Sequence, residues 1–295
     1  MIADLCCIGH ITLDYVITPE TSVTMPGGTA FYFSHAVHQM DLHYSLVTAL
    51  AKTEISFAQS LVELGIEVKV LPSQHTVVFE NRYSENLDHR TQRVLQTADP
   101  FTPALLHSIE AKVFHLGPLL SHDFSAEAFR VLADKGKLAL DVQGFLRRVK
   151  GEQVLPTDWK EKIELLPFVH FLKVNEDELK VLTGHTDARC GAKLLASWGV
   201  KEVVVTLGSK GSLIYDGNRF FTIPAYAPIR IHDATGCGDT YMAGYLYRRV
   251  KGDDIQQAGE FAAAMASLKL AVSGPFDGTE QDVESFLKEA LEVDA

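Results

Sequence analysis

Cysteines and basic residues are scarce in this sequence, and each scarcity excludes a class of protein. Four cysteines occur in 295 residues, without Cys-x-x-Cys or Cys/His spacing, so neither a disulfide scaffold nor a zinc site is predicted. Acidic residues outnumber basic ones by 38 to 27, which gives a formal charge of −11. This balance argues against nucleic acid or an anionic membrane as the main partner, because both are bound through an excess of lysine and arginine.

Long apolar runs and targeting signals are also lacking. No stretch approaches the roughly 20 apolar residues that span a bilayer, so no membrane segment is predicted. An acid, Asp4, stands near the N-terminus, where a signal peptide would carry basic residues. Since the few cysteines also fit a reducing compartment, we expect a cytoplasmic protein.

What the sequence does contain is a regular alternation of strand-like and helix-like segments. Short apolar runs such as 2–9 and 44–50 alternate with segments of helical spacing such as 55–65 and 176–184. This alternation is typical of a mostly parallel sheet covered by helices. No internal repeat or low-complexity linker interrupts it, so residues 1–295 are predicted to form a single α/β domain.

Two segments depart from the alternation. Residues 74–98 have apolar side chains at every second position, with a turn at Asn86 and Asp88, and this pattern predicts an exposed hairpin. Together with the segment at about 11–26, the hairpin is expected to protrude from the domain as a small β lid.

The motif DATGCGD, residues 233–239, lies between a strand-like segment and a predicted helix. Small residues let successive backbone amides turn toward one anion, and the following helix adds the partial positive charge of its N-terminus. Asp239 at the head of this helix could accept a proton from an attacking hydroxyl group. The alternative is an ordinary loop with an aspartate cap.

Two further motifs follow predicted strands. In KVNEDEL, residues 173–179, Asn175 and Glu178 offer the oxygen ligands that hydrated Mg²⁺ prefers. In VVVTLGSKG, residues 203–211, glycines permit the close approach of a phosphate or a base. Taken alone, each motif is explained as well by a helix cap or by a β-turn.

In this order and spacing the three motifs resemble the PfkB (ribokinase-like) family of carbohydrate and nucleoside kinases, over essentially the whole chain. The resemblance implies a ribokinase-like three-layer α/β/α sandwich and transfer of the γ-phosphoryl group of ATP to a hydroxyl of a sugar or polyol. It implies that Asp239 is the catalytic base and that the amides of Gly236, Cys237 and Gly238 form the anion hole.

On the donor side, the resemblance implies ATP and Mg²⁺ as cofactors. Asn175 and Glu178 match the motif that organises Mg²⁺ and phosphates. Nucleotide binding is implied for the positions of the TLGSKG motif, namely Thr206, Gly208 and Gly211. Asp233 matches an acid that some members associate with a monovalent cation, which makes K⁺ a candidate second ion.

On the acceptor side, Asp14 matches the early substrate-binding aspartate of the family, and Gly27 and Gly28 match its Gly-Gly turn. A carboxylate aimed at vicinal hydroxyls is suited to holding a polyol. Thr29 follows the turn where many members have asparagine, so contacts with the acceptor are expected to differ there.

The lid hairpin, HLGPLL at 115–120 and DVQGFLR at 141–147 are closer to short PfkB proteins, including plant-type myo-inositol kinases and archaeal nucleoside kinases. Arg93, Gln143 and Arg147 are therefore predicted to face the acceptor; a solvated strand arginine and a pair at a helix start are the alternatives. Because lid strands in this family often pair between subunits, a homodimer through the lid is a further expectation.

Two other functions compete with a sugar or polyol kinase. One is a nucleoside kinase of the same fold, and the other is a non-catalytic protein that senses a nucleotide or a sugar. A dinucleotide-dependent oxidoreductase is disfavoured because the first strand runs into GHITLD instead of GxGxxG. The P-loop pattern GxxxxGK[ST] is absent as well.

Overall fold

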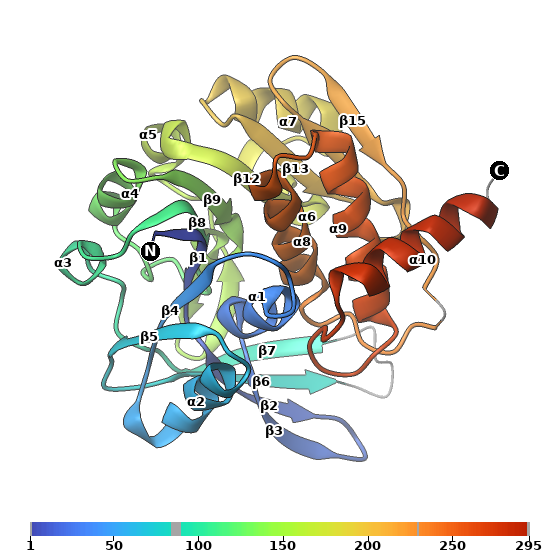
Figure 1. The fold of residues 1–295 in the computed structure, drawn as a ribbon. Helices are drawn as coiled ribbons and strands as arrows, with labels where there is room; N and C mark the ends of the chain where they lie inside the picture. Colours follow the sequence, from blue (N-terminus) through green and yellow to red (C-terminus); the bar gives the residue numbers. More distant parts are fainter. Residues whose placement is uncertain (1, 84–89, 229, 294–295) are drawn as a thin grey trace.

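The computed structural model describes residues 2–83, 90–228 and 230–293. In these ranges the chain forms a nine-stranded central sheet, a separate six-stranded sheet and the helices that cover the central sheet (Figure 1). Every helix within them is too short or too polar to span a bilayer. The turn predicted at Asn86 and Asp88 lies outside the described residues.

The central sheet has the strand order β15-β14-β13-β12-β9-β8-β1-β4-β5. All pairs from β13 to β5 are parallel, and β14 and β15 are antiparallel additions at one edge. The predicted mostly parallel sheet is therefore confirmed. Its strands are β1 (Ala3–Gly9), β4 (Tyr44–Leu50), β5 (Glu67–Pro72), β8 (Ala111–Gly117), β9 (Lys137–Asp141), β12 (Val169–Asn175), β13 (Glu202–Thr206), β14 (Ser212–Tyr215) and β15 (Phe220–Ile223).

Helices cover both faces of the central sheet, because its parallel strands are apolar on both sides. In β1, Leu5 and Cys7 point into one core and Cys6 and Ile8 into the other. The first core is covered by α1 (Thr29–Val37), α2 (Ile55–Glu63), α8 (Cys237–Lys251), α9 (Ile255–Leu270) and α10 (Glu280–Val293). The second is covered by α3 (Pro103–Leu106), α4 (Ala126–Ala133), α5 (Lys162–Leu165), α6 (Glu176–Thr183) and α7 (Ala188–Ser197).

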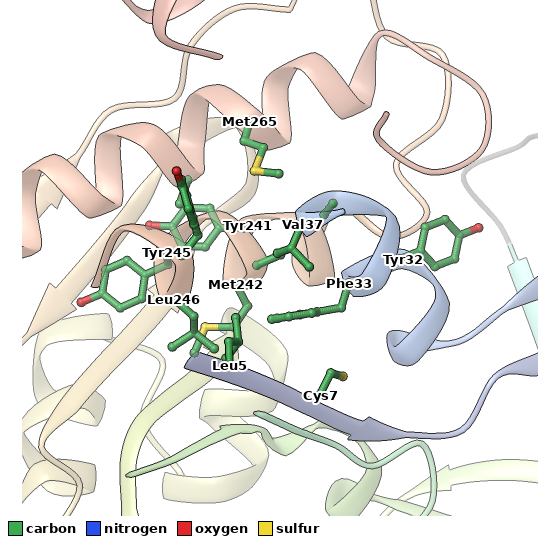
Figure 2. Packing of buried hydrophobic residues seen from close by; sticks show 14 of the residues in the cluster. Leu5, Cys7, Tyr32, Phe33, Val37, Tyr241, Met242, Tyr245, Leu246 and Met265 are labelled. Atoms are coloured by element: carbon green, nitrogen blue, oxygen red, sulfur yellow. The ribbon is translucent and has the colours of Figure 1, made fainter. Parts of the chain in front are cut away.

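The first core joins the two helices that carry much of the candidate site. Figure 2 shows Phe33 of α1 and Met242 of α8 side by side above Leu5 of β1. Each buried side chain of this size contributes roughly 1.5–3 kcal/mol through removal of apolar surface from water. Packing thus fixes the N-terminus of α8 relative to α1 and the sheet.

The six-stranded sheet lies below the central sheet in the view of Figure 1, with the order β10-β11-β7-β6-β2-β3. Its strands are β2 (Thr12–Ile17), β3 (Ser22–Gly27), β6 (Val77–Tyr83), β7 (Arg90–Gln96), β10 (Arg147–Lys150) and β11 (Gln153–Pro156). The predicted hairpin is present as β6 and β7, whereas the β10–β11 hairpin was not predicted, since strands of four residues, RRVK and QVLP, are too short to give a periodic signal. Phe79 and Val94 pack with Leu119 and Leu120 and so attach the sheet to the main body.

Candidate active site

Strands β9 and β12 bring a buried ion pair to the carboxyl edge of the central sheet. Asp141 and Lys173 are partners in the parallel register, so their side chains share a face. The Lys173 ammonium lies 2.8 Å from the Asp141 carboxylate, and both side chains are almost wholly buried. Burial opposes the charged form of Lys173, yet the neighbouring charges of Asp141 and Glu178 raise its pKa, so the lysine stays protonated.

The glycine-rich turn before α8 lies against this pair. Gly236 is the N-cap of α8 with φ 77°, and a Cβ there would lie 2.2 Å from the Tyr32 ring. A Cβ on Gly238 would lie 3.3 Å from the Lys173 ammonium nitrogen. Glycine is therefore needed at 236 for both its backbone conformation and its space, and the turn is held between α1 and β12.

The amides of the turn fit an anion-binding role, with one change from the prediction. The Cys237 amide donates to the Ala234 carbonyl at 3.2 Å and is already used. In the part of the chain that the structure describes, the amides of Gly236 and Gly238 donate no backbone hydrogen bond. Two of the three predicted amides therefore remain for an anion.

Asp239 lies in the first turn of α8, and its side chain is only partly exposed. Burial and then the negative charge of Asp141 raise the pKa of Asp239 to about 7, against the lowering effects of Lys173, the Thr29 hydroxyl and Arg147. A carboxyl group with a pKa near the operating pH can both take and release a proton, which is the requirement for a general base. Thr29, predicted to contact the acceptor, hydrogen-bonds this carboxyl group.

Asn175 and Glu178 form a capping box at the start of α6. The Glu178 amide donates to Asn175 Oδ1 at 2.8 Å, and the Asn175 amide donates to Glu178 Oε2 at 2.9 Å. Burial raises the pKa of Glu178, opposed by Lys173 and reinforced by Asp141. The helix-cap interpretation is therefore correct. The capping box uses Glu178 Oε2, and the other carboxylate oxygen of Glu178 is left for the cluster of Asp141, Glu178 and Asp239.

The two glycines of the predicted nucleotide-binding loop differ in the space around them. Thr206 is the register partner of Asn175, and its hydroxyl donates to the Val174 carbonyl at 3.4 Å. Gly208 has φ 58°, and a Cβ there would meet nothing within 4 Å. A Cβ at Gly211, by contrast, would lie 2.1 Å from the Ile223 carbonyl oxygen. Gly211 is thus required by the fold, while Gly208 leaves space at the sheet edge.

Asp14 and the Gly-Gly turn lie together on β2 and β3. The Thr12 hydroxyl donates to Asp14 Oδ1 at 2.6 Å. A Cβ on Gly27 would lie 2.5 Å from Asp14 Oδ2, and a Cβ on Gly28 would lie 2.5 Å from the His10 carbonyl oxygen. The first glycine therefore makes room for the carboxylate, and the second, with φ 85°, turns the chain into α1.

Of the three further residues predicted to contact the acceptor, two lie near Asp141 and Asp239 and one does not. Gln143 lies in the turn after β9, and its backbone N–H donates to Asp141 Oδ1 at 3.4 Å. Arg147 is close enough to Asp239 for its charge to lower the pKa of that carboxyl. Arg93 does not join this group. Its guanidinium pairs with Glu80 at 3.1 Å and with Glu152.

The position of Arg93 follows from the alternation of side chains on β7. Val94 and Phe79 are register partners that face the main body, so Arg93 and its partner Glu80 point to the opposite face of the six-stranded sheet. Arg93 thus lies on the face opposite to Asp14, and the structure gives no support to the prediction that it faces an acceptor held by Asp14. The face that carries Asp14 instead carries Asn81, whose side-chain oxygen accepts a hydrogen bond from Gln92 at 2.9 Å.

Asp233, the predicted K⁺ ligand, faces a lysine that sequence reasoning missed. Its Oδ1 accepts the Thr235 amide at 2.9 Å, and its backbone carbonyl accepts the Lys269 ammonium at 2.8 Å. Lys173 and Asp141 were missed as well. The available signal was a lysine inside an otherwise apolar segment, VHFLKVN for β12 and ASLKLAV for α9, because a buried lysine requires a partner.

The three-layer α/β/α fold places Asp239 at the head of α8, beside the glycine-rich turn and the Lys173 ammonium, an arrangement suited to phosphoryl transfer to a hydroxyl group. The family model described as pfkB family carbohydrate kinase matches residues 66–282. The chain belongs to the pfkB family of carbohydrate kinases. It is an enzyme of the phosphotransferase class with a ribokinase-like fold, as predicted, and the kinases of this family use ATP and a divalent metal.

One curated protein and two solved structures are among those similar to this chain. Cytidine kinase from Thermococcus kodakarensis is 29% identical over 273 residues, which cover 86% of this chain and 91% of that protein. A solved pyrophosphate-dependent kinase of the ribokinase family, complexed with a pyrophosphate analog and myo-inositol, is 29% identical with a TM-score of 0.84, covering 95% and 99% of the two chains. A pyrophosphate-dependent myo-inositol-1 kinase converted by mutation into a myo-inositol-3 kinase is 28% identical with a TM-score of 0.86, covering 97% and 99%.

Proposed function

We propose that this protein transfers the γ-phosphoryl group of ATP to a hydroxyl group of a sugar or polyol, with Asp239 as the general base. The observation that carries the proposal is the position of Asp239 in the first turn of α8, between the free amides of the turn and the Thr29 hydroxyl. Its pKa of about 7 allows it to be ionised when the acceptor binds and protonated after transfer.

The turn and the ion pair supply charge stabilisation for the phosphoryl group. The amides of Gly236 and Gly238 donate to oxygens of the phosphoryl group that is transferred. The Lys173 ammonium, which is fixed by Asp141, places a positive charge next to Gly238. Because these groups are already in place before reaction, little reorganisation is needed as negative charge develops. Positioning and charge stabilisation are the main sources of catalysis in phosphoryl transfer.

The acid-rich cluster fits a hydrated Mg²⁺. Asp141, Glu178 and Asp239 face Lys173 and Arg147. Burial and the charge of Asp141 raise the pKa values of Glu178 and Asp239, and the two cations oppose this rise. No group of three ligating side chains gathers at metal-binding distances among the described residues. A hydrated Mg²⁺ needs only one or two protein oxygens, because waters and phosphates supply its other ligands. Asn175 and Glu178 would hold it, and it would neutralise charge on the donor phosphates.

The acceptor site is proposed on the inner face of the six-stranded sheet. Asp14, fixed by Thr12, would accept hydrogen bonds from vicinal hydroxyls, with Gln143 and Arg147 on the other side. We propose that this sheet acts as a lid that excludes water and limits ATP hydrolysis, within a single domain of residues 1–295. The exposed edge strand β3 offers backbone groups for a homodimer, which light scattering would test.

Two alternatives remain for the substrates. A nucleoside acceptor is favoured by the similarity to a cytidine kinase, which extends over 86% of this chain. Pyrophosphate as donor is suggested by the solved kinase that is described as pyrophosphate-dependent. The two alternatives concern different halves of the reaction and are tested independently.

The test is a matrix of initial rates with the purified protein. MgATP and magnesium pyrophosphate are each combined with pentoses, hexoses, myo-inositol and nucleosides, and phosphorylated product is detected by mass spectrometry. Asp239→Asn should lower kcat by about 10²–10⁴-fold, while the control Asp177→Asn, an exposed acid in the first turn of α6, should not. Binding of donor with no product from any pair would contradict the proposal and favour the sensing role.

A further inference from the structure

Lys269 is a wholly buried lysine near the C-terminal end of α9, with 0% of its surface exposed. Its ammonium donates to the Asp233 carbonyl at 2.8 Å and to the Val272 carbonyl at 3.4 Å, and lies 3.6 Å from Asp233 Oδ2. Carbonyl and carboxylate oxygens grouped around one positive centre form the environment that also binds a partly dehydrated monovalent cation. Here the positive centre belongs to the protein.

The surrounding backbone makes this position suitable for a cation. The loop before the anion-binding turn runs along the end of α9, where the His232 amide donates to the Leu270 carbonyl at 2.8 Å and Arg230 Nε donates to the Ala271 carbonyl at 3.0 Å. The carbonyl end of a helix carries partial negative charge. Together with the Asp233 carboxylate, it stabilises an ammonium that is otherwise costly to bury.

Asp233 connects this ammonium to the catalytic turn. One carboxylate oxygen accepts the Thr235 amide at 2.9 Å, and the other faces Lys269. Thr235 directly precedes Gly236, the N-cap of α8. A positive charge at Lys269 therefore fixes the start of the segment whose amides and Asp239 are proposed to act in catalysis.

We propose that the Lys269 ammonium is an internal cation that replaces a bound K⁺ at Asp233 and holds the turn 233–239 in its anion-binding conformation. A K⁺ ion on the same oxygens would lie within a few ångströms of the ammonium, and the repulsion of like charges disfavours it. The inference rests on the proposed phosphoryl transfer at this turn. In it, the Lys269 ammonium takes the place of the K⁺ ion that was expected from the sequence. Lys269 acts through the loop and is a positioning residue.

The first measurement compares the unaltered protein in potassium chloride and in tetramethylammonium chloride at equal ionic strength. We expect initial rates within twofold of each other and the same melting temperature, since the site already holds its cation. An activation by K⁺ of tenfold or more, or a melting temperature raised by K⁺, would overturn the proposal. The melting comparison needs no turnover, so it decides on Lys269 even if no substrate pair reacts.

The second measurement uses Lys269→Ala, which leaves space for an ion, and Lys269→Met, which fills the position of the stem without a charge. We expect Lys269→Ala to lose at least tenfold in kcat in tetramethylammonium and to regain most of it in K⁺ or NH₄⁺. Its melting temperature should rise by about 2–5 °C in 0.1 M K⁺, as for any ligand that binds the folded state. Lys269→Met should show the loss without the rescue.

Lys251→Ala is the matched control. The Lys251 ammonium also binds one backbone carbonyl and one carboxylate of a single residue, Asp41 at 3.1 and 2.7 Å, but it lies at the surface. This variant should show neither loss nor rescue. Full activity of Lys269→Ala without K⁺ would overturn the proposal. If Lys269→Ala does not fold in either salt, the response of the unaltered protein to K⁺ decides alone.

Discussion

The side chains of Lys173 and Asp141 form a buried ion pair at the carboxyl ends of β12 and β9. Nζ and Oδ2 lie 2.8 Å apart, and the ammonium also lies against Gly238 in the turn before Asp239. A buried pair of this kind contributes little net stability, but removal of one partner leaves an uncompensated charge. Its presence beside the glycine-rich turn therefore points to a role for the positive charge in the site.

Lys173→Met is expected to lower both stability and activity. The unpaired Asp141 should cost about 3–5 kcal/mol in the free energy of unfolding, measured by urea denaturation. The double variant Asp141→Asn/Lys173→Met should regain most of this stability because no buried charge is left, while kcat stays low. Lys112→Met is the control, since the exposed Lys112 pairs with Asp4 in the first strand at 2.7 Å. A double variant that regained kcat would assign Lys173 a structural role only.

The pH profile should report the titration of Asp239. Burial and Asp141 raise its folded-state pKa from 3.8 to about 7, and the base must be ionised to accept a proton. We therefore expect kcat/KM to fall about tenfold per pH unit below this pKa. A profile that stayed flat between pH 5 and 7, with substrate still bound, would contradict Asp239 as the base.

The same pKa shift predicts that stability falls as pH rises, whereas activity is expected to rise. Between the unfolded pKa of 3.8 and the folded value of about 7, the folded state binds more protons than the unfolded state. The contribution of Asp239 to stability is thus fully present below pH 4 and is lost as pH rises to 7. At pH 8, Asp239→Asn should be more stable than the unaltered protein by roughly 1–4 kcal/mol, with no such gain for Asp177→Asn.

Local patterns in the sequence were sufficient to predict the fold class and several of the elements that carry the candidate site residues. Strand and helix periods are set by neighbouring residues, so the parallel sheet and the helix at Asp239 could be predicted. The Lys173–Asp141 pair could not, because nothing in either segment specifies its partner across the sheet. The orientation of Arg93 could have been predicted, since Val94 is apolar and adjacent strand residues face opposite sides.

The prediction of the anion hole shows a different limit. The glycines of DATGCGD indicate free amides, but whether each amide is free depends on how the turn closes. The structure closes it with a hydrogen bond from the Cys237 amide to the Ala234 carbonyl. The Lys269 ammonium, which holds the turn from outside, comes from a segment more than 30 residues later in the chain. Such long-range partners leave only weak signals in a single sequence.

Gly236→Ala should be far more damaging than the same change at Gly184. Both glycines have φ 77°, so alanine is strained at either position. A Cβ at Gly184 meets nothing within 4 Å, whereas at Gly236 it would lie 2.2 Å from the Tyr32 ring. We expect Gly184→Ala to cost about 1 kcal/mol with unchanged kcat. Gly236→Ala should lower kcat by at least tenfold; equal effects of the two changes on kcat would contradict the proposed role of the turn.

Side chains on the two faces of β7 should differ in their effect on the acceptor. Arg93 pairs with Glu80 on the outer face, so Arg93→Ala is expected to change the KM for the acceptor less than threefold and stability by about 1 kcal/mol or less. Gln92 donates to Asn81 Oδ1 on the face that carries Asp14, so Gln92→Leu leaves this oxygen without its donor where the acceptor is expected. Its KM should rise by at least tenfold for a polyol, or its preferred hydroxyl should change, as shown by NMR of the product. A larger effect from Arg93→Ala than from Gln92→Leu would place the acceptor elsewhere.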